Sequence, residues 1–263
     1  MQPDELRAAL PPAWRHDLRK LHFESVEGGM SGARLYRLRG PSSDELYLKM
    51  AEPGELADFR SEVERTQWLF AKGISVPDVT RVFDDGRQGA ALMTALPGAH
   101  PHELQKPIGE IVRYLAQGLR ALHAHAIADC PFDETIAARL ARARAMIAQG
   151  RVEREHFAER NRGRSAQSLY QQLANSASKI EHLVLVYGDA KFDNMLVDAQ
   201  GNLGFIDCGH AGRGDRYLDL EAVIGDIDEH FGAQWIDTFA RAYGEIELDS
   251  AKLDFFSDLY ELF

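Results

Sequence analysis

Residues 183–194 read LVLVYGDAKFDN. The first four are apolar and are typical of a short buried strand. The glycine and aspartate after the tyrosine interrupt this run and predict a loop that presents the carboxylate of Asp189. Asn194 follows five residues later. We therefore expect an acid and an amide in one loop.

Residues 195–209 read MLVDAQGNLGFIDCG. The apolar runs on either side of the polar turn predict an antiparallel hairpin, which would place Asn194 roughly opposite Asp207. An amide oxygen and a carboxylate suit Mg²⁺, whose remaining ligands are phosphate oxygens and water. We predict Asn194 and Asp207 as metal ligands and Asp189 as the group that receives a proton. The alternative is an ordinary hairpin with solvated turn carboxylates.

Residues 27–33, EGGMSGA, join two runs that alternate like strands. Glycine lets backbone N–H groups approach phosphate oxygens, and the hydroxyl of Ser31 adds a donor. A glycine-rich hairpin turn that binds nothing is the alternative. The phosphate-binding interpretation therefore depends on the strand that follows.

That strand, ELYLKM, places Tyr47 and Lys49 on one face. Lys49 suits a phosphate, and the ring of Tyr47 suits stacking on adenine. Residues 55–72 predict a helix with Glu62 on its core-facing side, where an unpaired carboxylate would be costly. We predict a Lys49–Glu62 ion pair, the arrangement that positions ATP phosphates in protein kinases. A surface pair of Glu62 with Arg65 is the alternative.

A buried strand is predicted over residues 90–96, ending at a proline and a glycine. We place a boundary here, with an N-lobe of residues 1–96 and a C-lobe of residues 97–263. An apolar stripe over residues 108–122 predicts a helix, and His123 and His125 are expected at a helix end or on the surface rather than as ligands. Further helices are predicted over 134–148, 165–182, 216–230, 233–243 and 249–263. The expected fold class is α+β, with a small β-rich N-lobe and a larger, mostly helical C-lobe.

These stretches together resemble the aminoglycoside phosphotransferase family, and most of all the aminoglycoside 3′-phosphotransferases. The resemblance covers nearly the whole chain from residue 29 and rests on IDCG at 206–209, GRGDRYLD at 212–219, LYLKM at 46–50, DCPF at 129–132 and YELF at 260–263. It implies a two-lobed, protein-kinase-like fold, ATP and Mg²⁺ as cofactors, and phosphoryl transfer to a hydroxyl of a cationic aminosugar antibiotic, with the 3′-hydroxyl as the expected acceptor.

The resemblance also assigns roles to single residues. It implies an adenine-binding linker in which backbone groups near Thr94 and Leu96 contact the base edge and Met93 lines the pocket. With the residues discussed above, the expected nucleotide-binding set is Ser31, Tyr47, Lys49, Glu62, Met93, Thr94 and Leu96. The expected acceptor-binding set is Glu159, Asp189, Glu229, Glu261 and the α-carboxylate of Phe263. A solvated acidic face is the alternative for Glu229.

The chain departs from the family's pattern at four places. Tyr187 replaces a histidine that is usual in the family, and His210 and Gly225 occupy positions that are often arginine. The stretch 151–164 contains five arginines where several relatives have an acidic substrate loop. The losses at 210 and 225 remove cationic support near the phosphates or the acidic wall, with slower turnover or a different substrate as the expected result. The arginine-rich stretch affects the assignment of the acceptor more than the assignment of the phosphotransferase chemistry.

Composition agrees with an enzyme of this kind. The 263 residues, 45% of them hydrophobic, are enough for two lobes with cores. A formal net charge of −11 disfavours general binding to nucleic acid or to anionic membranes, and it attracts a polycation. The start MQPDE lacks a signal-peptide pattern, and no apolar run approaches the ~20 residues that span a membrane. Two cysteines without metal-ligand spacing predict reduced thiols in the cytoplasm.

The predicted function is therefore ATP- and Mg²⁺-dependent phosphorylation of an aminoglycoside by a monomer or weak dimer. Two alternatives stay open: a kinase of another small hydroxylated molecule, and a catalytically poor nucleotide-binding regulatory module. The presence of Lys49, Asp189, Asn194 and Asp207 together disfavours the second alternative, because a protein that only binds a nucleotide has no need of a base.

Overall fold

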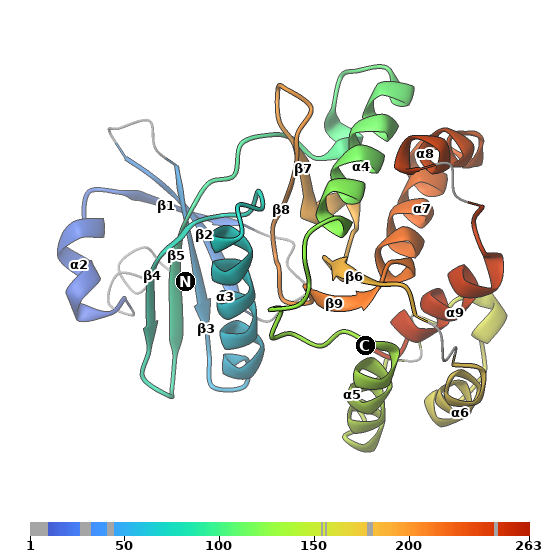
Figure 1. Cartoon of the computed structure of the whole chain (residues 1–263). Helices are drawn as coiled ribbons and strands as arrows, with labels where there is room; N and C mark the ends of the chain where they lie inside the picture. The colour runs from blue at the N-terminus through green and yellow to red at the C-terminus, as the bar shows by residue number, and fades with distance from the viewer. Residues whose placement is uncertain are drawn as a thin grey trace. The chain divides into compact units, whose positions relative to one another are not determined.

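The computed structural model describes residues 10–26, 33–40, 45–153, 155, 157–177, 181–244 and 247–263. The chain forms two compact units, which Figure 1 traces in order of residue number. One unit comprises Met1–Pro97 and Phe205–Gly209, and the other comprises Gly98–Gly204 and His210–Phe263. The segment 205–209 thus belongs to the first unit although its chain neighbours belong to the second.

The first unit is built on a five-stranded sheet. Its strands are β1 (His22–Val26), β2 (Arg34–Arg39), β3 (Leu46–Ala51), β4 (Val79–Asp84) and β5 (Gly89–Thr94), in the spatial order β1-β2-β3-β5-β4. Every neighbouring pair is antiparallel. The sheet agrees with the predicted β-rich N-terminal part.

Two helices cover opposite faces of this sheet. Helix α2 (Pro12–Leu18) buries Trp14 against a cluster that includes Leu48 of β3. Helix α3 (Leu56–Ala71) buries Phe59 and Val63 against a second cluster that includes Ala51 of β3. Because side chains alternate along a strand, these two clusters lie on opposite faces, and Lys49 points to the face that carries α3.

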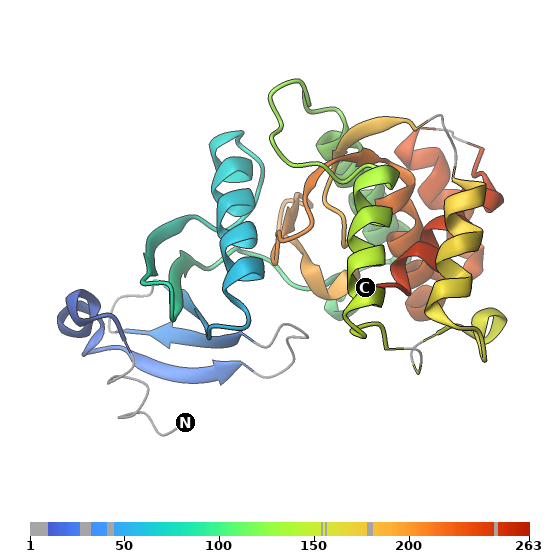
Figure 2. The same cartoon turned by 90° about the horizontal axis from the view of Figure 1, so that it is seen from below.

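The second unit is mostly helical, as predicted. Its helices are α4 (Ile108–His123), α5 (Ile136–Ala148), α6 (Ala166–Ser176), α7 (Tyr217–Phe231), α8 (Ile236–Tyr243) and α9 (Ser250–Tyr260). Helix α4 packs beside α8 and α9 packs beside α7 (Figure 1). Helix α6 contacts both α5 and α9, and Figure 2 shows the yellow α6 near the green α5 with part of the red C-terminal chain between them. The apolar stripe predicted for α4 is fully buried at Ile111, Val112, Leu115 and Leu119.

Two small sheets frame the loop that carries Asp189. Strand β6 (Leu183–Val186) pairs antiparallel with β9 (Gly212–Asp215), and β7 (Met195–Val197) pairs with β8 (Leu203–Phe205). Both the buried strand before the loop and the hairpin after it are therefore confirmed.

Several elements differ from the expectation. Helix α2 and strand β4 were not predicted, and the helix predicted over 249–263 ends at Tyr260. The helix predicted over 165–182 ends at Ser176, since Ala177 leaves the helical conformation with φ −53° and ψ 121°. Strand β9 was not predicted, because glycines disfavour strands. Here Gly214 is needed: a Cβ at this position would lie 2.8 Å from the carbonyl oxygen of Glu134. The strand passes close to residues 132–134 and hydrogen bonds to them on one side.

Within the described residues, no helix is both long and apolar enough to cross a membrane.

Two helical glycines give a test of the packing in the second unit. A Cβ on Gly118 of α4 would lie 2.3 Å from the Cβ of Leu203, whereas a Cβ on Gly225 of α7 would meet no atom within 4 Å. We expect Gly118→Ala to lower the free energy of unfolding by about 1–2 kcal/mol, because overpacking outweighs the gain in helix propensity. Gly225→Ala, the control, should raise it by about 0.5–1 kcal/mol. Urea denaturation of both variants measures the difference, and equal effects would contradict the described contact between α4 and β8.

Candidate active site

Lys49 is the centre of a buried charge cluster in the first unit. Its Nζ donates to Glu62 Oε2 at 2.6 Å and to Asp207 Oδ1 at 3.1 Å. The predicted Lys49–Glu62 ion pair is present. The alternative partner, Arg65, donates instead to the Ser61 hydroxyl at 3.0 Å. Helix α3 thus fixes the lysine ammonium beside Asp207.

The two carboxylates keep Lys49 charged. Burial opposes the charge on the ammonium, but the negative charges of Glu62 and Asp207 outweigh that cost, so the pKa of Lys49 is raised above its usual value. A lysine that is buried, cationic and held by two acids is suited to phosphate oxygens, which can replace part of this negative charge.

Asp207 has a strained backbone. Among the described residues other than glycine, it alone has a positive φ, of 56°. Such a conformation costs about 1–3 kcal/mol in a residue with a Cβ and is found mainly at functional sites. The segment around it is held in the first unit by the hydrogen bond from the Phe205 N–H to the Ser75 carbonyl oxygen, at 2.9 Å. The strain therefore supports a functional role for this aspartate.

The segment also contains Cys208, which is completely buried. Burial raises the pKa of the Cys208 thiol well above its usual value, so the thiolate is suppressed. Cys130 donates to the Phe132 carbonyl oxygen at 3.6 Å, and neither cysteine forms a disulfide. Both are free thiols, as predicted.

In the second unit, Gly188 lets the chain turn after β6. It has a φ of 87°, and a Cβ here would lie 2.1 Å from the carbonyl oxygen of His210. Glycine is therefore required at this position. The turn delivers Asp189 into a loop whose next residues form a short 3₁₀ turn, Phe192–Asn194.

Both oxygens of the Asp189 carboxylate accept hydrogen bonds. Oδ2 accepts from the Asn194 side-chain amide at 2.8 Å, and Oδ1 accepts from the Tyr260 hydroxyl at 2.9 Å. Burial raises the pKa of Asp189, and Tyr260, Lys191, Arg139 and Asn194 partly offset this effect. A carboxylate with a raised pKa and a fixed orientation is suited to receive a proton.

Asn194 uses its amide nitrogen on Asp189, on both the side chain and the backbone oxygen, the latter at 3.2 Å. Its amide oxygen is then the atom suited to a metal. No cluster of three or more His, Cys, Asp or Glu able to hold a metal occurs among the described residues. The half-exposed carboxylate of Asp207, in the first unit, is likewise the kind of hard oxygen ligand that Mg²⁺ takes beside phosphates and water.

Lys191, two residues after Asp189, was not assigned a role from the sequence. Its Nζ lies 4.3 Å from the centroid of the Tyr260 ring. Burial opposes its charge, but the contacts with Tyr260 and the charge of Asp189 raise its pKa overall. The proposed base therefore has a cation from its own loop and an aromatic ring from the end of α9 beside it.

Asp219 of α7 was also missed, although it lies in the quoted GRGDRYLD motif. Its carboxylate is completely buried and accepts the backbone N–H groups of Tyr187 and Gly188 at 2.7 and 2.6 Å. His123 Nε2 lies 3.0 Å from the same carboxylate, and His123 Nδ1 lies 2.6 Å from the hydroxyl of Tyr243. The prediction of a helix-end position for His123 is confirmed, because the residue ends α4, but its ring is buried in this network and not on the surface.

The residues expected at the adenine stay a prediction, and the contacts of those that the structure describes are as follows. Ser31 lies outside the described residues. Tyr47 donates its hydroxyl to Glu45 at 3.1 Å, and Met93 lies on the sheet face that carries α3. Thr94 uses its backbone N–H on the Asp78 carbonyl oxygen at 3.0 Å, while Leu96 follows the end of β5. The N–H of Thr94 is therefore already bonded within the protein.

The expected acceptor-binding acids fall into two groups. Glu261 accepts from the Asn161 side-chain amide at 3.1 Å, and the Phe263 ring lies 4.9 Å from the guanidinium carbon of Arg139. Glu159 and Glu229 are exposed, and Glu159 lies 3.8 Å from Arg162. Only Glu261 and Phe263 therefore belong to the same packed C-terminal segment as Tyr260.

The arginines of the 151–164 stretch are not all free to meet an acceptor. Arg160 donates to Asp258 of α9 at 2.7 Å, and Arg164 donates to the side-chain oxygen of Asn161 at 2.9 Å. Asp258 also accepts from the Asn161 amide at 2.7 Å. Part of this positive charge thus holds α9 in place.

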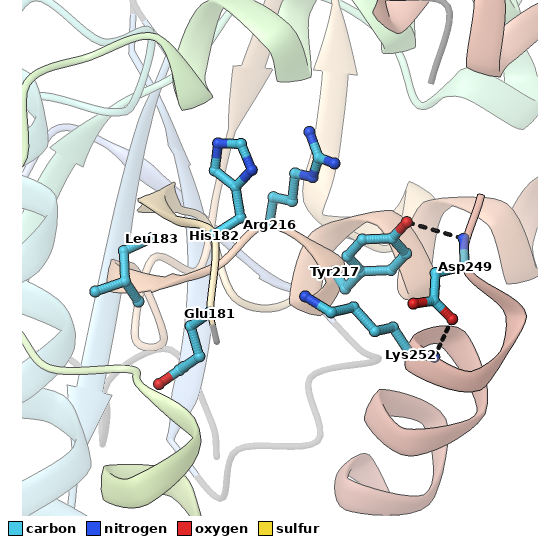
Figure 3. Close-up of a pocket in the computed structure, with 7 residues that line it drawn as sticks. All are labelled: Glu181, His182, Leu183, Arg216, Tyr217, Asp249 and Lys252. Carbon is cyan, nitrogen blue, oxygen red and sulfur yellow. Dashed lines mark hydrogen bonds between the residues drawn. The ribbon is translucent and has the colours of Figure 1, made fainter. Parts of the chain in front are cut away.

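An open pocket of about 380 Å³ lies elsewhere on the second unit, and none of the predicted site residues lines it (Figure 3). Several of the polar groups that line it form hydrogen bonds within the protein. Lys252 donates to the buried Asp215 at 2.9 Å, and the Asp249 N–H donates to the Tyr217 hydroxyl at 2.9 Å. Asp215 also accepts the His182 N–H at 3.0 Å. We interpret this pocket as a junction of β6, α7 and α9.

Comparison with known proteins agrees with the geometry. Residues 22–256 match the model of the phosphotransferase enzyme family, and the chain belongs to this family. An aminoglycoside 3′-phosphotransferase from Streptomyces fradiae is 32% identical over 256 residues, covering 92% of this chain and 95% of that protein. One from Escherichia coli is 30% identical over 240 residues, covering 89% of this chain and 88% of that protein.

Solved structures give the same answer for the fold. A crystal structure of an aminoglycoside-3′-phosphotransferase of type VIII superimposes with a TM-score of 0.83 at 32% identity, covering 99% of this chain and 97% of that one. An aminoglycoside phosphotransferase from Streptomyces rimosus, in complex with ADP and streptomycin, has a TM-score of 0.76 at 23% identity, covering 98% and 95%. The expected protein-kinase-like fold and the family resemblance are both confirmed.

The buried network around Asp219 can be tested through stability. Asp219→Asn would place an amide NH₂ among N–H donors that require an acceptor, so we expect a loss of about 2–4 kcal/mol in the free energy of unfolding. Urea denaturation measures the loss. Asp228→Asn, at an exposed position of the same helix, is the control and should change stability by less than about 0.5 kcal/mol. A stability of Asp219→Asn equal to that of the control would contradict the role of this carboxylate.

Proposed function

We propose that the protein transfers the γ-phosphoryl group of ATP to a hydroxyl of an aminoglycoside, with the 3′-hydroxyl as the first candidate. The observation that carries the proposal is the Asp189–Asn194 pair, a fixed carboxylate and a metal-suited amide in one loop, bonded at 2.8 Å. A protein that only bound a nucleotide would not need this carboxylate. The phosphotransferase family membership supports the reaction class.

Each cluster has a distinct part in the proposed reaction. Lys49, fixed by Glu62, binds the α- and β-phosphates, and Asn194 and Asp207 hold Mg²⁺. The metal, when bound, neutralises phosphate charge. Asp189 orients the acceptor hydroxyl and takes its proton late, because a loose phosphoryl-transfer transition state depends more on positioning than on base strength. The glycine-rich loop with Ser31 is proposed to cover the phosphates, and Tyr47, Met93, Thr94 and Leu96 to contact the base.

The acceptor class rests on the relatives and on charge. Relatives about 30% identical over most of their length are named aminoglycoside 3′-phosphotransferases. A net charge of −11 favours a polycationic acceptor. We propose that Glu261 and the Phe263 carboxylate bind ammonium groups, with Glu159 and Glu229 contributing from exposed positions. The proposal places a monomer or weak dimer in the cytoplasm, with no nucleic-acid or membrane partner.

Asp189→Ala tests the base. We expect kcat to fall by ~10²–10⁴, because a general base contributes about this much, while ATP affinity stays within threefold. The assay is ADP release with kanamycin as the acceptor. Asp193→Ala, at an exposed position in the same loop, is the matched control and should keep kcat. Turnover of Asp189→Ala within threefold of the wild type would refute the assignment.

Lys49 and Asp207 can be separated by kinetics. Lys49→Ala should raise the KM for ATP about tenfold or more, because it removes a contact present before and during transfer. Asp207→Ala should abolish turnover, because it removes a metal ligand. Lys106→Ala is the control, since this partly exposed lysine pairs with Glu110, four residues along the chain, and contacts none of the proposed site residues that the structure describes. Full Mg²⁺-dependent activity in Asp207→Ala would rule out the metal site.

The acceptor is tested with aminoglycosides that have or lack a 3′-hydroxyl. We expect turnover only with the 3′-hydroxyl compounds, and we expect Glu261→Gln to raise their KM about tenfold while leaving the KM for ATP unchanged, since the substitution keeps shape and removes charge. Turnover that ignores the 3′-hydroxyl, together with unaltered kinetics of Glu261→Gln, would favour a kinase of another small hydroxylated molecule.

A further inference from the structure

The hydroxyl of Tyr260 is bonded to the group that the proposed mechanism assigns to the acceptor. It donates to Asp189 Oδ1 at 2.9 Å. The other carboxylate oxygen is already held by Asn194, which also bonds the Asp189 backbone oxygen. Asn194 thus holds the carboxylate through the oxygen that Tyr260 does not contact. What Tyr260 adds is a neutral hydroxyl donor on the remaining oxygen, which is also what an acceptor alcohol would bring.

The bond from Tyr260 is long for its kind. Hydrogen bonds from a hydroxyl to a carboxylate usually span about 2.5–2.7 Å, so 2.9 Å indicates a weak one. The bond from the Asn194 amide, at 2.8 Å, is shorter than the commonest N–H···O distance of about 2.9–3.0 Å. The contact with Tyr260 is therefore the one that an incoming hydroxyl can replace more readily.

The surroundings allow such a replacement without unfolding the C-terminal segment. Tyr260 is the last residue of α9, and its neighbours Leu259 and Leu262 are 1% and 0% exposed. These two leucines anchor the backbone, while the side chain of Tyr260 is only half-buried and rests against Lys191. Movement of one side chain is enough to clear Asp189.

We propose that Tyr260 occupies the acceptor position on Asp189 and that an acceptor hydroxyl must displace it before phosphoryl transfer. The proposal rests on the proposed function, since it takes Asp189 as the base. It makes Tyr260 a specificity residue: a ligand has to offer both a hydroxyl and enough further contacts to displace the phenol. It also makes Tyr260 a barrier to water, the smallest competing acceptor.

The competing reaction is hydrolysis of ATP. When water lies on Asp189 Oδ1, its oxygen forms a bond to the γ-phosphorus as the bond to the β,γ-bridging oxygen breaks. The water proton passes to Asp189 and then to solvent, leaving ADP and phosphate. Tyr260 reduces this loss by filling the place of the water.

Tyr260→Phe is the test, because it removes the hydroxyl and keeps the ring beside Lys191. We expect Mg²⁺-dependent ATP hydrolysis without acceptor to rise about threefold to tenfold, the effect of removing one competing hydrogen bond. The KM for kanamycin should fall by a similar factor, with kcat within twofold. Tyr114→Phe is the matched control: its phenol is bonded to the carboxylate of Glu110 at 2.5 Å, and its loss should change neither activity. Thermal unfolding checks that both variants are folded.

The outcomes separate the two proposals. If the wild type phosphorylates no aminoglycoside, the proposed acceptor class is wrong, and ATP hydrolysis alone still tests Tyr260. A fall in kcat with unchanged KM would mean that Tyr260 positions Asp189, which overturns the inference. The inference is also overturned if Tyr260→Phe hydrolyses ATP no faster than the wild type. It is overturned as well if Tyr260→Phe hydrolyses ATP no faster than Asp189→Ala.

Discussion

The buried carboxylate of Asp219 holds the chain at the point where β6 turns into the loop of Asp189. A charge removed from water is costly unless several donors surround it. Here the N–H groups of Tyr187 and Gly188 and the ring of His123 meet it within 3.0 Å. The position of the loop is thereby tied to helices α4 and α7, whose apolar faces form the core of the second unit. The position of the proposed base, Asp189, therefore depends on this core.

The side chains to which the proposed function gives roles form two hydrogen-bonded clusters, one in each compact unit. Lys49, Glu62 and Asp207 form one cluster, and Asp189, Asn194 and Tyr260 form the other. The hairpin β7–β8 leads from one cluster directly into the segment of the other. Residues 205–209 belong to the first unit, whereas the residues just before and just after them belong to the second. The strained backbone of Asp207 lies within these five residues.

The elements that depend on local pattern could be predicted from the sequence. The helix that carries Glu62 follows from its apolar spacing, and its partner Lys49 follows from the cost of an unpaired acid on a buried face. The contacts that join distant segments could not be predicted. Tyr260 reaches Asp189 across 71 positions, and His123 reaches Asp219 across 96. The spacing of apolar residues along the chain does not indicate which distant residues are in contact. A histidine at a helix end is, moreover, usually exposed. The GRGDRYLD motif drew attention to Asp219, but it did not indicate which groups the carboxylate contacts.

Cys208 gives the molecule a natural reporter group. The thiol lies next to Asp207, is fully shielded from solvent, and has little tendency to ionise. An alkylating reagent can modify it only when residues 205–209 leave the sheet and helix of the first unit. The rate of that modification would therefore measure how often the strained aspartate detaches. If a nucleotide binds as proposed, with phosphates on Lys49 and a metal on Asp207, it would slow labelling at this sulfur, while the more accessible Cys130 would serve as an internal standard.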